Sequence, residues 1–269
     1  MTRPYAEVIG DPIAHSKSPL IHNFWLKKLG IDAEYRATRV TQAELPGYFD
    51  ARRVDPLFRG CNITMPLKET ALPLIDTVQR AATAIGAINT VRRGEDGRFH
   101  GRNSDVHGVW RAMDGIDLVG RTALLIGAGG AARAAAYALK RREIADMIVM
   151  SRNPATGQRI LDDFGLAGSS VPFGPFPAAA VLINATPLGM AGKPWSVLDF
   201  SLVSQDTVAF DMVYQPVETE FLTRATEASL RCVGGLTMLM HQAGEAFATL
   251  FGVGAPRQYD HELRERLIA

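Results

Sequence analysis

A glycine-rich turn, GAGGAA, occupies residues 127–132, between an apolar run, TALLI, and a run of helix-forming residues, AARAAAYALKRR. Gly127, Gly129 and Ala132 fall on the three positions of the GxGxx(G/A) dinucleotide fingerprint. There the first glycine permits a tight turn, the second lets a pyrophosphate approach the backbone, and the small third residue lets the helix pack on the strand. The helix N-terminus then attracts the phosphate charge. We therefore expect a dinucleotide site at this turn, to which Ala128, Gly130 and Ala131 also belong.

The residues after the next apolar run, MIVM at 147–150, indicate which dinucleotide binds. NAD enzymes carry an acidic residue at the end of this second strand, where it binds the ribose hydroxyls. Here Ser151, Arg152 and Asn153 follow the run, and Asp146 precedes it, at the wrong end of the strand. Arg152 offers a planar cation to a 2′-phosphate, and its two neighbours can add hydrogen bonds. The sequence therefore favours NADP(H) over NAD, with a surface cation at a strand end as the alternative reading of Arg152.

Two charged residues are candidates for the chemistry that a bound nicotinamide would require. Lys68 lies in GCNITMPLKE and Asp105 in GRNSDVHG. Hydride transfer to a ketone builds negative charge on the carbonyl oxygen, so the site needs a proton donor and a group that holds the donor in place. A lysine ammonium, with an unperturbed pKa of about 10.4, can donate that proton, and a carboxylate can orient it. Because the two residues are 37 positions apart, spacing alone does not show that they meet.

Two further polar clusters stand at apparent strand ends. One is HSKS at 15–18, and the other is NAT at 184–186. The ends of parallel strands meet at one edge of a sheet, so this grouping favours a common cleft. His15 is an alternative catalytic base, although beside Ser16 and Ser18 it could serve only the loop.

These clusters lie in a chain where short apolar runs alternate with helical stretches, which predicts an α/β fold with largely parallel sheets. Strands are expected near 6–9, 33–40, 59–63 and 87–91, with helices between them. The segment SPLIHNFWLKKLG predicts a helix with Pro19 in its first turn and Gly30 at its C-terminal stop.

A second block begins near Asp105 with the strand–turn–helix–strand order of a mononucleotide-binding unit. Strands are expected at 181–184, 208–211 and 231–233, each apolar enough to be buried on both faces. Helices are expected after Gly235, and a loop at 164–177, which is rich in Gly, Pro and Ser.

The composition excludes several classes of protein. Hydrophobic residues make up 47%, charged residues 21%, and the formal net charge is +1, as in a soluble globular protein without a basic surface for nucleic acid. The N-terminus resembles no secretory signal, and no apolar stretch suits a membrane span, so we expect a cytoplasmic protein. Cys61 and Cys232 have no CxxC or CxxH neighbour, so we expect both to be reduced and buried and expect no metal site.

Taken together, these segments closely resemble the shikimate dehydrogenase family over the full length of the chain. The resemblance rests on GDPIAHSKSPLIHN, GCNITMPLKE, GAINTV, GRNSDVHG, the glycine turn with its Arg133, INATPLGM, FDMVYQPVETEFL and GLTMLMHQAGEAF, all in the family's order. It implies an N-terminal α/β substrate domain, a Rossmann-like NADP domain and C-terminal helices that return to the first domain, with a cleft between the domains. The expected boundaries are 1–103 with 237–269 for the substrate domain and 104–236 for the NADP domain.

The resemblance also implies roles for individual residues. Lys68 and Asp105 become the catalytic pair, and Ser16 and Ser18 bind a substrate carboxylate. Thr64, Asn89 and Gln242 contact hydroxyls or ring substituents of the substrate, and Asn62 and Tyr214 line or support the same cleft. Thr186, Met190, Met212 and Gly235 lie along the nicotinamide and its ribose. The turn at 127–131, with Ser151, Arg152 and Asn153, binds the rest of the cofactor.

The chain departs from the family's pattern at several of these places. It has Asn103-Ser104-Asp105-Val106 where Asn-Thr-Asp-Gly is common, and Ser-Arg-Asn-Pro at 151–154 where Asn-Arg-Thr with a nearby second arginine is usual. Thr237 stands where glycine is common, and Pro187 where serine is frequent. These departures concern substrate fit, NADP affinity and the nicotinamide pocket.

The expected activity is therefore NADPH-dependent reduction of 3-dehydroshikimate to shikimate, by a monomer or a homodimer. The alternatives are a relative that acts on quinate or another shikimate-like polyol, and a cofactor-binding sensor without chemistry. The presence of both Lys68 and Asp105 argues against the sensor.

Overall fold

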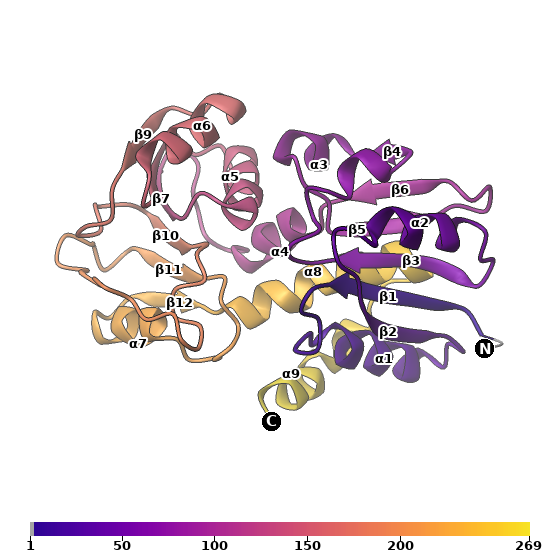
Figure 1. The fold of residues 1–269 in the computed structure, drawn as a ribbon. Coiled ribbons are helices and arrows are strands. Elements are labelled where there is room, and N and C mark those ends of the chain that lie inside the picture. Colours follow the sequence, from indigo (N-terminus) through magenta and orange to yellow (C-terminus); the bar gives the residue numbers. More distant parts are fainter. Residues whose placement is uncertain (1–2) are drawn as a thin grey trace. The chain divides into compact units, whose positions relative to one another are not determined.

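The computed structural model describes residues 3–269, which form two compact units (Figure 1). Unit 1 contains the described residues up to Ser104 together with Gln242–Ala269, and unit 2 contains Asp105–His241. Each unit is built on one six-stranded sheet with helices packed on it. The predicted α/β fold is confirmed.

The sheet of unit 1 has the strand order β2-β1-β3-β5-β6-β4. Its strands are β1 (Tyr5–Gly10), β2 (Glu34–Arg39), β3 (Phe58–Ile63), β4 (Thr77–Val78), β5 (Thr90–Arg93) and β6 (Phe99–Arg102). β1 is parallel to β2 and β3, and β4 is parallel to β6, whereas β5 is antiparallel to β3 and β6. This sheet is therefore mixed, and β1, β2 and β3 form its parallel part.

Three of the four strands predicted in this unit are confirmed, and the fourth starts later than predicted. β5 begins at Thr90 rather than Ala87 because the preceding backbone is used elsewhere. The N–H of Ala87 donates to Ala82 O, and the N–H of Ile88 donates to Lys68 O at 2.9 Å. Residues 87 and 88 therefore form a connection that touches the lysine loop, whereas Asn89 already bonds to Arg102 O and Ile63 N–H of the neighbouring strands.

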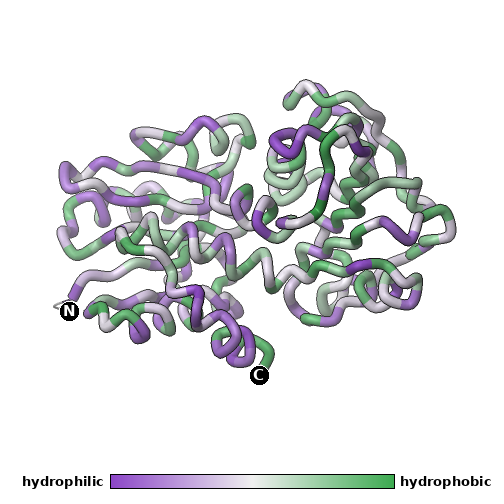
Figure 2. Tube along the Cα trace, turned by 180° about the vertical axis from the view of Figure 1, so that it is seen from behind, coloured by the Kyte–Doolittle hydropathy of each residue, from purple (hydrophilic) through white to green (hydrophobic). Residues whose placement is uncertain are grey.

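Both faces of this sheet are covered by helices. One hydrophobic cluster joins Ile9, Cys61 and Phe99 of the strands to Leu45 and Phe49 of α2 (Leu45–Arg53). The helices of this unit also include α1 (Ser18–Leu29), α3 (Arg80–Ile85), α9 (Asp260–Ile268) and the C-terminal part of α8 (Gly235–Phe251), with 3-10 turns at Leu72–Leu74 and Arg257–Tyr259. α9 is mainly hydrophilic except in its last turn (Figure 2), and it buries Leu263 and Leu267.

α1 has the predicted start and stop. Pro19 lies in its first turn, where the absence of an N–H costs nothing. Gly30 follows the last turn with φ 64°, a left-handed conformation that glycine adopts without a Cβ clash. The predicted helix is confirmed.

The sheet of unit 2 is parallel throughout, with the order β12-β11-β10-β7-β8-β9. Its strands are β7 (Thr122–Ile126), β8 (Asp146–Met150), β9 (Gly168–Val171), β10 (Val181–Asn184), β11 (Val208–Asp211) and β12 (Arg231–Val233). Numbered within the unit, this is the 3-2-1-4-5-6 order of dinucleotide-binding domains, whose ligands bind where the order reverses. The reversal falls between β7 and β10.

The central strands of this sheet are buried on both faces. Leu124 and Leu182 pack in a cluster with Phe221 of α7 (Glu220–Glu227), while the intervening Leu125 and Ile183 are equally inaccessible. The unit's other helices are α4 (Asp105–Ala112), α5 (Gly130–Arg141) and α6 (Pro154–Phe164). The apolar runs seen in the sequence therefore reflect a sheet with two covered faces.

Three sequence predictions are wrong in this unit, all at the edges of its sheet. The segment predicted as loop contains β9, whose small residues pair with β8 as an edge strand. β12 is exposed at Arg231 and Cys232 because it forms the opposite edge, so it is not buried on both faces. Cys232 is accordingly an exposed thiol, whereas Cys61 is buried as expected.

His22 of α1 is buried among aromatic side chains. Its ring is stacked on Tyr35 with a centroid distance of 4.0 Å and an interplanar angle of 6°, and only 1% of the residue is exposed. Nδ1 has no hydrogen-bond partner among the described residues. Burial lowers the pKa of His22 from 6.5 to about 3, because the charged ring would lose its hydration.

We expect His22→Phe to reduce the loss of stability in acid. The unfolded chain takes up a proton on His22 below pH 6.5 and the folded chain does so only near pH 3, so this residue's contribution is lost as the pH falls between those values. The wild-type free energy of unfolding should fall more steeply than that of the variant, by up to about 1.4 kcal/mol per pH unit. Urea denaturation at several pH values between 4 and 7 measures the difference. His261→Gln, which removes an exposed histidine of α9, serves as the control and should keep the wild-type slope; equal slopes for His22→Phe and wild type would contradict the assignment.

Candidate functional site

In unit 1 the loops that follow β1 and β3 are joined by backbone hydrogen bonds. The N–H of Thr64 donates to Ile9 O at 2.9 Å, and the N–H of Asp11 donates to Met65 O at 3.2 Å. The loop that carries Ser16 and Ser18 is thus held at the same end of the sheet as Thr64. This is the carboxyl end of the parallel strands, where α/β proteins bind their ligands.

The two serines lie at the beginning of α1. The N–H of Ser18 donates to Ser16 Oγ at 3.3 Å, and both residues are partly exposed. The helix has no side-chain cap on its first turn. Its first N–H groups carry partial positive charge, which together with two hydroxyls suits a carboxylate.

Lys68 is placed by its main chain beside the connection that leads into β5. The turn at 64–67 is closed by a hydrogen bond from Leu67 N–H to Thr64 O at 3.0 Å, and Leu67 is fully buried. Lys68 O then accepts the N–H of Ile88 at 2.9 Å. The lysine is therefore held next to the residue that precedes Asn89, and its side chain is partly exposed.

Asn62 and Asn89 belong to one buried hydrogen-bond network. Asn62 Oδ1 accepts the hydroxyl of Tyr35 at 2.6 Å, and its Nδ2 donates to Asn89 O at 3.1 Å and to Thr90 Oγ1 at 2.9 Å. The Thr90 hydroxyl donates to Asn89 Oδ1 at 3.0 Å. The amide of Asn62 is thus engaged at both ends, and 7% of this residue is exposed.

Ser104 extends the network to α8. Its N–H donates to Asn89 Oδ1 at 2.7 Å, and its Oγ lies 3.1 Å from Gln242 Oε1 and 3.2 Å from Asn89 Oδ1. Two residues earlier, Arg102 Nη1 donates to Glu245 at 2.7 Å and to Thr249 at 2.8 Å. Asp105, the first residue of α4, follows Ser104 directly and is buried.

His15, the alternative base, is exposed on the loop after β1. It takes no part in the hydrogen-bond network that holds Asn62, Asn89 and Gln242.

In unit 2 the glycine turn lies between β7 and α5, as the fingerprint requires. Gly127 has φ 115°, and a Cβ there would come within 3.0 Å of Thr186 Cγ2 and 3.1 Å of Ala185 O. In contrast, a Cβ at Gly129 or Gly130 would meet nothing within 4 Å. The turn is therefore closed against β10 and open in front of the first turn of α5, which is the shape that a pyrophosphate needs.

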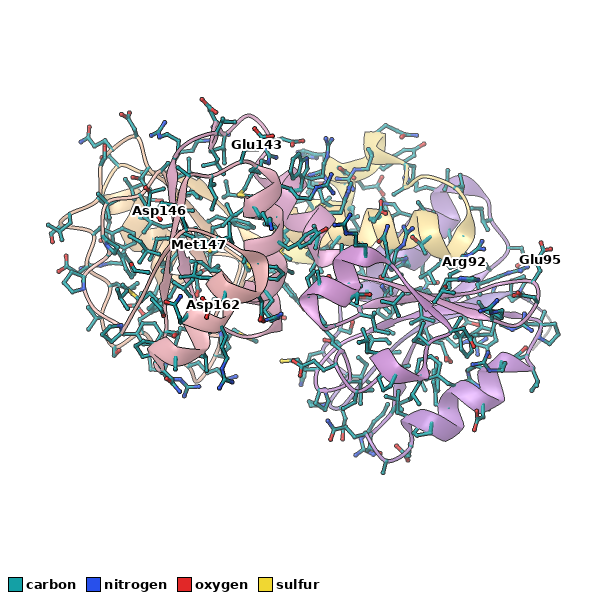
Figure 3. All side chains as sticks on the ribbon, turned by 90° about the horizontal axis from the view of Figure 1, so that it is seen from above. Arg92, Glu95, Glu143, Asp146, Met147 and Asp162 are labelled. Carbon is teal, nitrogen blue, oxygen red and sulfur yellow. The ribbon has the colours of Figure 1, made fainter. Side chains whose placement is uncertain are left out.

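The residues after β8 form a hydrogen-bonded turn that leads into α6. Ser151 is buried, and its Oγ donates to Asn153 O at 2.9 Å, while Asn153 Oδ1 caps α6 by accepting the N–H of Ala155. Arg152 lies between them with an exposed side chain. Asp146 stands at the other end of the strand, beside Met147 (Figure 3).

A buried carboxylate organises the ends of β10 and β11. Asp211 accepts from Asn184 Nδ2 at 2.8 Å, from Val213 N–H at 2.9 Å and from the hydroxyl of Thr219 at 2.5 Å. Asn184 Oδ1 in turn accepts the N–H and hydroxyl of Thr186. Burial raises the pKa of Asp211 to about 6, although these three donors act in the opposite direction.

Close backbone contact places Gly235 against the loop after β11. A Cβ on Gly235 would lie 2.4 Å from Val213 O and 2.6 Å from Met212 O. Met212 and Tyr214 on that loop are partly exposed, and burial raises the pKa of the Tyr214 hydroxyl. Met190, after β10, is exposed. Unit 2 thus holds Thr186, Met212, Tyr214 and Gly235 around the ends of two adjacent strands.

Sequence reasoning missed the residues that hold this geometry together. Tyr35, Thr90, Asp211 and Thr219 do not belong to the predicted site, although each hydrogen-bonds a residue that does or braces its loop. One signal was available, because Asn184 and Asp211 are polar residues that end fully apolar runs, VLIN and VAFD. A polar residue at the end of a buried strand indicates a network that must satisfy it.

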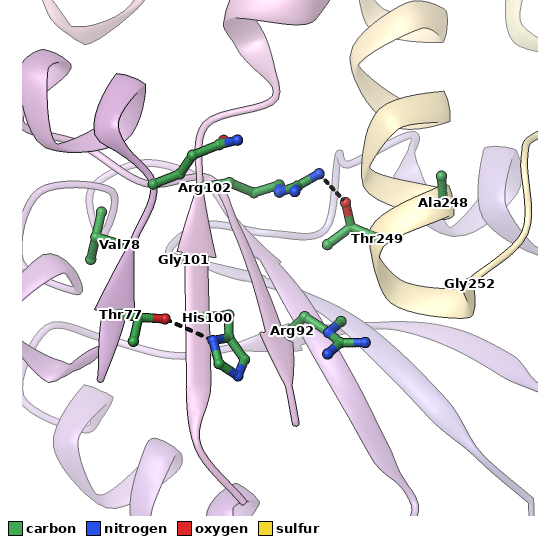
Figure 4. A pocket seen from close by; sticks show the side chains of 10 residues that line it. Thr77, Val78, Arg92, His100, Gly101, Arg102, Ala248, Thr249 and Gly252 are labelled. Atoms are coloured by element: carbon green, nitrogen blue, oxygen red, sulfur yellow. Dashed lines mark hydrogen bonds between the residues drawn. The ribbon is translucent and has the colours of Figure 1, made fainter. Parts of the chain in front are cut away.

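A separate pocket of about 520 Å³ opens in unit 1, at β4, β6 and the last turns of α8 (Figure 4). Arg92, His100, Arg102 and Thr249 line it, and Thr77 hydrogen-bonds His100 Nδ1 at 2.7 Å. None of the residues predicted for substrate or cofactor is among its lining residues. The chemistry suggested by the sequence therefore does not reside in this pocket.

The arrangement can support hydride transfer to a polar, carboxylated substrate. Unit 1 offers hydroxyls, amides and a lysine at one end of its sheet, and unit 2 offers a turn that fits a dinucleotide.

No helix in the part of the chain that the structure describes is long and apolar enough to cross a membrane. Among residues 3–269 no group of His, Cys, Asp and Glu side chains could hold a metal ion.

Comparison with known proteins agrees with this reading. Residues 8–91 match the family model described as the shikimate dehydrogenase substrate binding domain. The chain is 43% identical to the shikimate dehydrogenase (NADP(+)) of Sphingopyxis alaskensis, over 99% of this chain and 97% of that protein.

Two solved structures share the whole fold. The shikimate 5-dehydrogenase of Thermus thermophilus, in complex with NADP(H) and shikimate, is 36% identical with a TM-score of 0.87, over 98% of this chain and 99% of the other. The quinate dehydrogenase of Corynebacterium glutamicum, in complex with NAD, is 29% identical with a TM-score of 0.87 over the same shares of the two chains.

We expect Gly235→Ala to destabilise unit 2 and Gly234→Ala to have little effect. The added methyl group at 235 would overlap backbone oxygens that cannot rotate away, whereas at 234 it would meet only Leu222 Cδ1 at 3.7 Å. Overpacking of this kind costs about 1–3 kcal/mol. Chemical denaturation of both variants measures the difference. Equal free energies of unfolding would contradict the prediction, because they would show that the backbone at 212–213 shifts to make room for the methyl group at little cost.

Proposed function

The chain belongs to the shikimate dehydrogenase family, and we propose that it catalyses the reversible reduction of 3-dehydroshikimate to shikimate with NADPH. The observation that carries this proposal is the gathering of two serines, a lysine and an amide network at one end of the unit 1 sheet. A carboxylated ring with several hydroxyls requires such a set of groups. Unit 1 is accordingly the substrate-binding unit and unit 2 the cofactor-binding unit.

The substrate is held by polar groups with different tasks. Ser16 and Ser18 bind its carboxylate at the start of α1. Thr64, Asn89 and Gln242 bind hydroxyls or ring substituents, and Tyr214 of unit 2 is a further residue that we assign to substrate binding. Asn62 acts as a support, because both ends of its amide are already occupied by Tyr35, Thr90 and the backbone of Asn89.

Lys68 and Asp105 are the catalytic pair. The Lys68 ammonium donates a proton to the carbonyl oxygen as that oxygen gains charge, and in the reverse direction the amine accepts the hydroxyl proton. Asp105 orients the ammonium and a substrate hydroxyl. When bound, the reduced nicotinamide supplies the hydride to the carbonyl carbon.

The cofactor would be held by residues of unit 2. The turn formed by Gly127, Ala128, Gly129, Gly130 and Ala131, at the N-terminus of α5, would hold its pyrophosphate. Ser151, Arg152 and Asn153 would bind the 2′-phosphate, with Arg152 as the cation that pairs with it. Thr186, Met190, Met212 and Gly235 would contact the nicotinamide and its ribose.

We expect Lys68→Ala to lose turnover while binding is retained. Removing a general acid costs about 10²- to 10⁴-fold in kcat. The measurement is the absorbance of reduced nicotinamide with purified protein, shikimate or quinate, and NADP or NAD. Lys27→Ala, which removes an exposed lysine of α1, is the control. Full activity of Lys68→Ala would show that this lysine is not the proton donor. If the wild-type protein preferred quinate or NAD, the chain would instead be assigned as a relative such as a quinate dehydrogenase.

Arg152→Ala should weaken NADP binding and leave NAD binding almost unchanged. A charge-assisted hydrogen bond is worth about 1.5–3 kcal/mol, so the KM for NADP should rise about 10- to 100-fold. Arg121→Ala, at the amino end of β7, removes an exposed arginine far along the strand from this loop and is the control. An equal rise of the KM for both cofactors would contradict a contact with the 2′-phosphate.

A further inference from the structure

Backbone groups decide how the two asparagine amides of the network are oriented. The carbonyl of Asn89 can only accept, so Asn62 must turn its Nδ2 toward it, at 3.1 Å. The N–H of Ser104 can only donate, so Asn89 must turn its Oδ1 toward it, at 2.7 Å. A reversed amide at either place would set donor against donor or acceptor against acceptor.

The hydroxyl protons then have defined positions. Thr90 Oγ1 accepts from Asn62, and its own proton goes to Asn89 Oδ1 at 3.0 Å. Asn89 Oδ1 therefore already accepts from the Thr90 hydroxyl and the Ser104 N–H. The single hydroxyl proton of Ser104 has two acceptors within reach, Gln242 Oε1 at 3.1 Å and Asn89 Oδ1 at 3.2 Å, and Gln242 Oε1 is the one with no other donor in the network.

We propose that Ser104 is a positioning residue that orients the amide of Gln242, so that Gln242 and Asn89 both offer N–H donors to the substrate. This inference rests on the proposed function, because the ligand is taken to be a ring polyol. Asn89 Nδ2 makes no hydrogen bond within the network, and neither does Gln242 Nε2. The site thus recognises lone pairs of oxygen atoms that are substituents on the substrate's ring.

The rotation of α8 supports the same geometry. Gln242, Glu245 and Thr249 lie at positions i, i+3 and i+7, on one face of the helix. Arg102 bonds the last two, and Ser104 the first. Arg102 therefore holds this face of the helix toward the end of β6. The Ser104 hydroxyl bonds the oxygen of the Gln242 amide, so that the amide nitrogen points away from Ser104.

Steady-state kinetics of four variants test the proposal. Ser104→Ala should raise the KM for shikimate about 5-fold, because one neutral hydrogen bond no longer orients the amide, and should change kcat and the KM for NADP less than about 2-fold. Ser104→Thr keeps the hydroxyl and should restore the wild-type KM. In a Gln242→Ala background Ser104→Ala should have little further effect, because the two residues act as one unit. Equal effects of Ser104→Ala in both backgrounds, or an unchanged KM, would overturn the proposal.

Gln242→Glu gives a test that does not depend on the buried serine. Glutamate keeps an acceptor for the Ser104 hydroxyl and lacks the N–H donor, and position 242 is partly exposed. Its KM for shikimate should rise at least as much as that of Gln242→Ala. A wild-type KM for Gln242→Glu would show that the amide N–H does not donate a hydrogen bond to the substrate.

The amide orientation is also measurable without turnover, by the side-chain amide signals of Asn89 and Gln242 in ¹⁵N NMR spectra. Ser104→Ala should shift the Gln242 signal more than that of Asn89, which keeps Thr90 and the backbone N–H at 104 as donors. An unchanged Gln242 signal would refute the positioning role. Absence of wild-type turnover with shikimate would instead refute the proposed function.

Discussion

The need to satisfy buried polar groups at the ends of strands is the constraint on which the site depends. In unit 1 the network that runs from Tyr35 through Asn62 and Thr90 to Asn89 is buried, so each donor must meet an acceptor. Two backbone groups, Asn89 O and Ser104 N–H, cannot exchange roles. They therefore impose one direction on the whole network, and the side-chain nitrogens of Asn89 and Gln242 are left without a hydrogen bond inside it.

The same constraint operates in unit 2 through a carboxylate. Asp211 connects Asn184, Thr219 and the backbone after β11, so that the loops after two neighbouring strands are joined by hydrogen bonds. Burial raises the pKa of Asp211, and the three donors stabilise its charged form. The loops that carry Thr186 and Met212 are thus held by a residue that need not touch a ligand.

The errors of the sequence reading in unit 2 lie where this constraint does not apply. β9 and β12 form the edges of the unit 2 sheet, where half of the strand's surroundings are missing. The polar GSSV of β9 therefore has little apolar pattern to reveal it, and Cys232 on β12 is exposed although its residue type is usually buried. Interior strands such as VLIN and VAFD were predicted with their observed limits, because burial on both faces demands an unbroken apolar run.

By itself the sequence determined the α/β class, the dinucleotide turn at 127–132 and the interior strands, because glycine geometry and apolar periodicity are local properties. The motifs that resemble one family identified Lys68, Asp105 and the polar residues around them as candidates for the site. Only the tertiary structure showed that Ile88 holds the Lys68 main chain, that Arg102 and Ser104 bind one face of α8, and that Asp211 joins two loops. These contacts join residues far apart in the chain, and a hydrogen bond between distant segments leaves no periodic trace in the sequence.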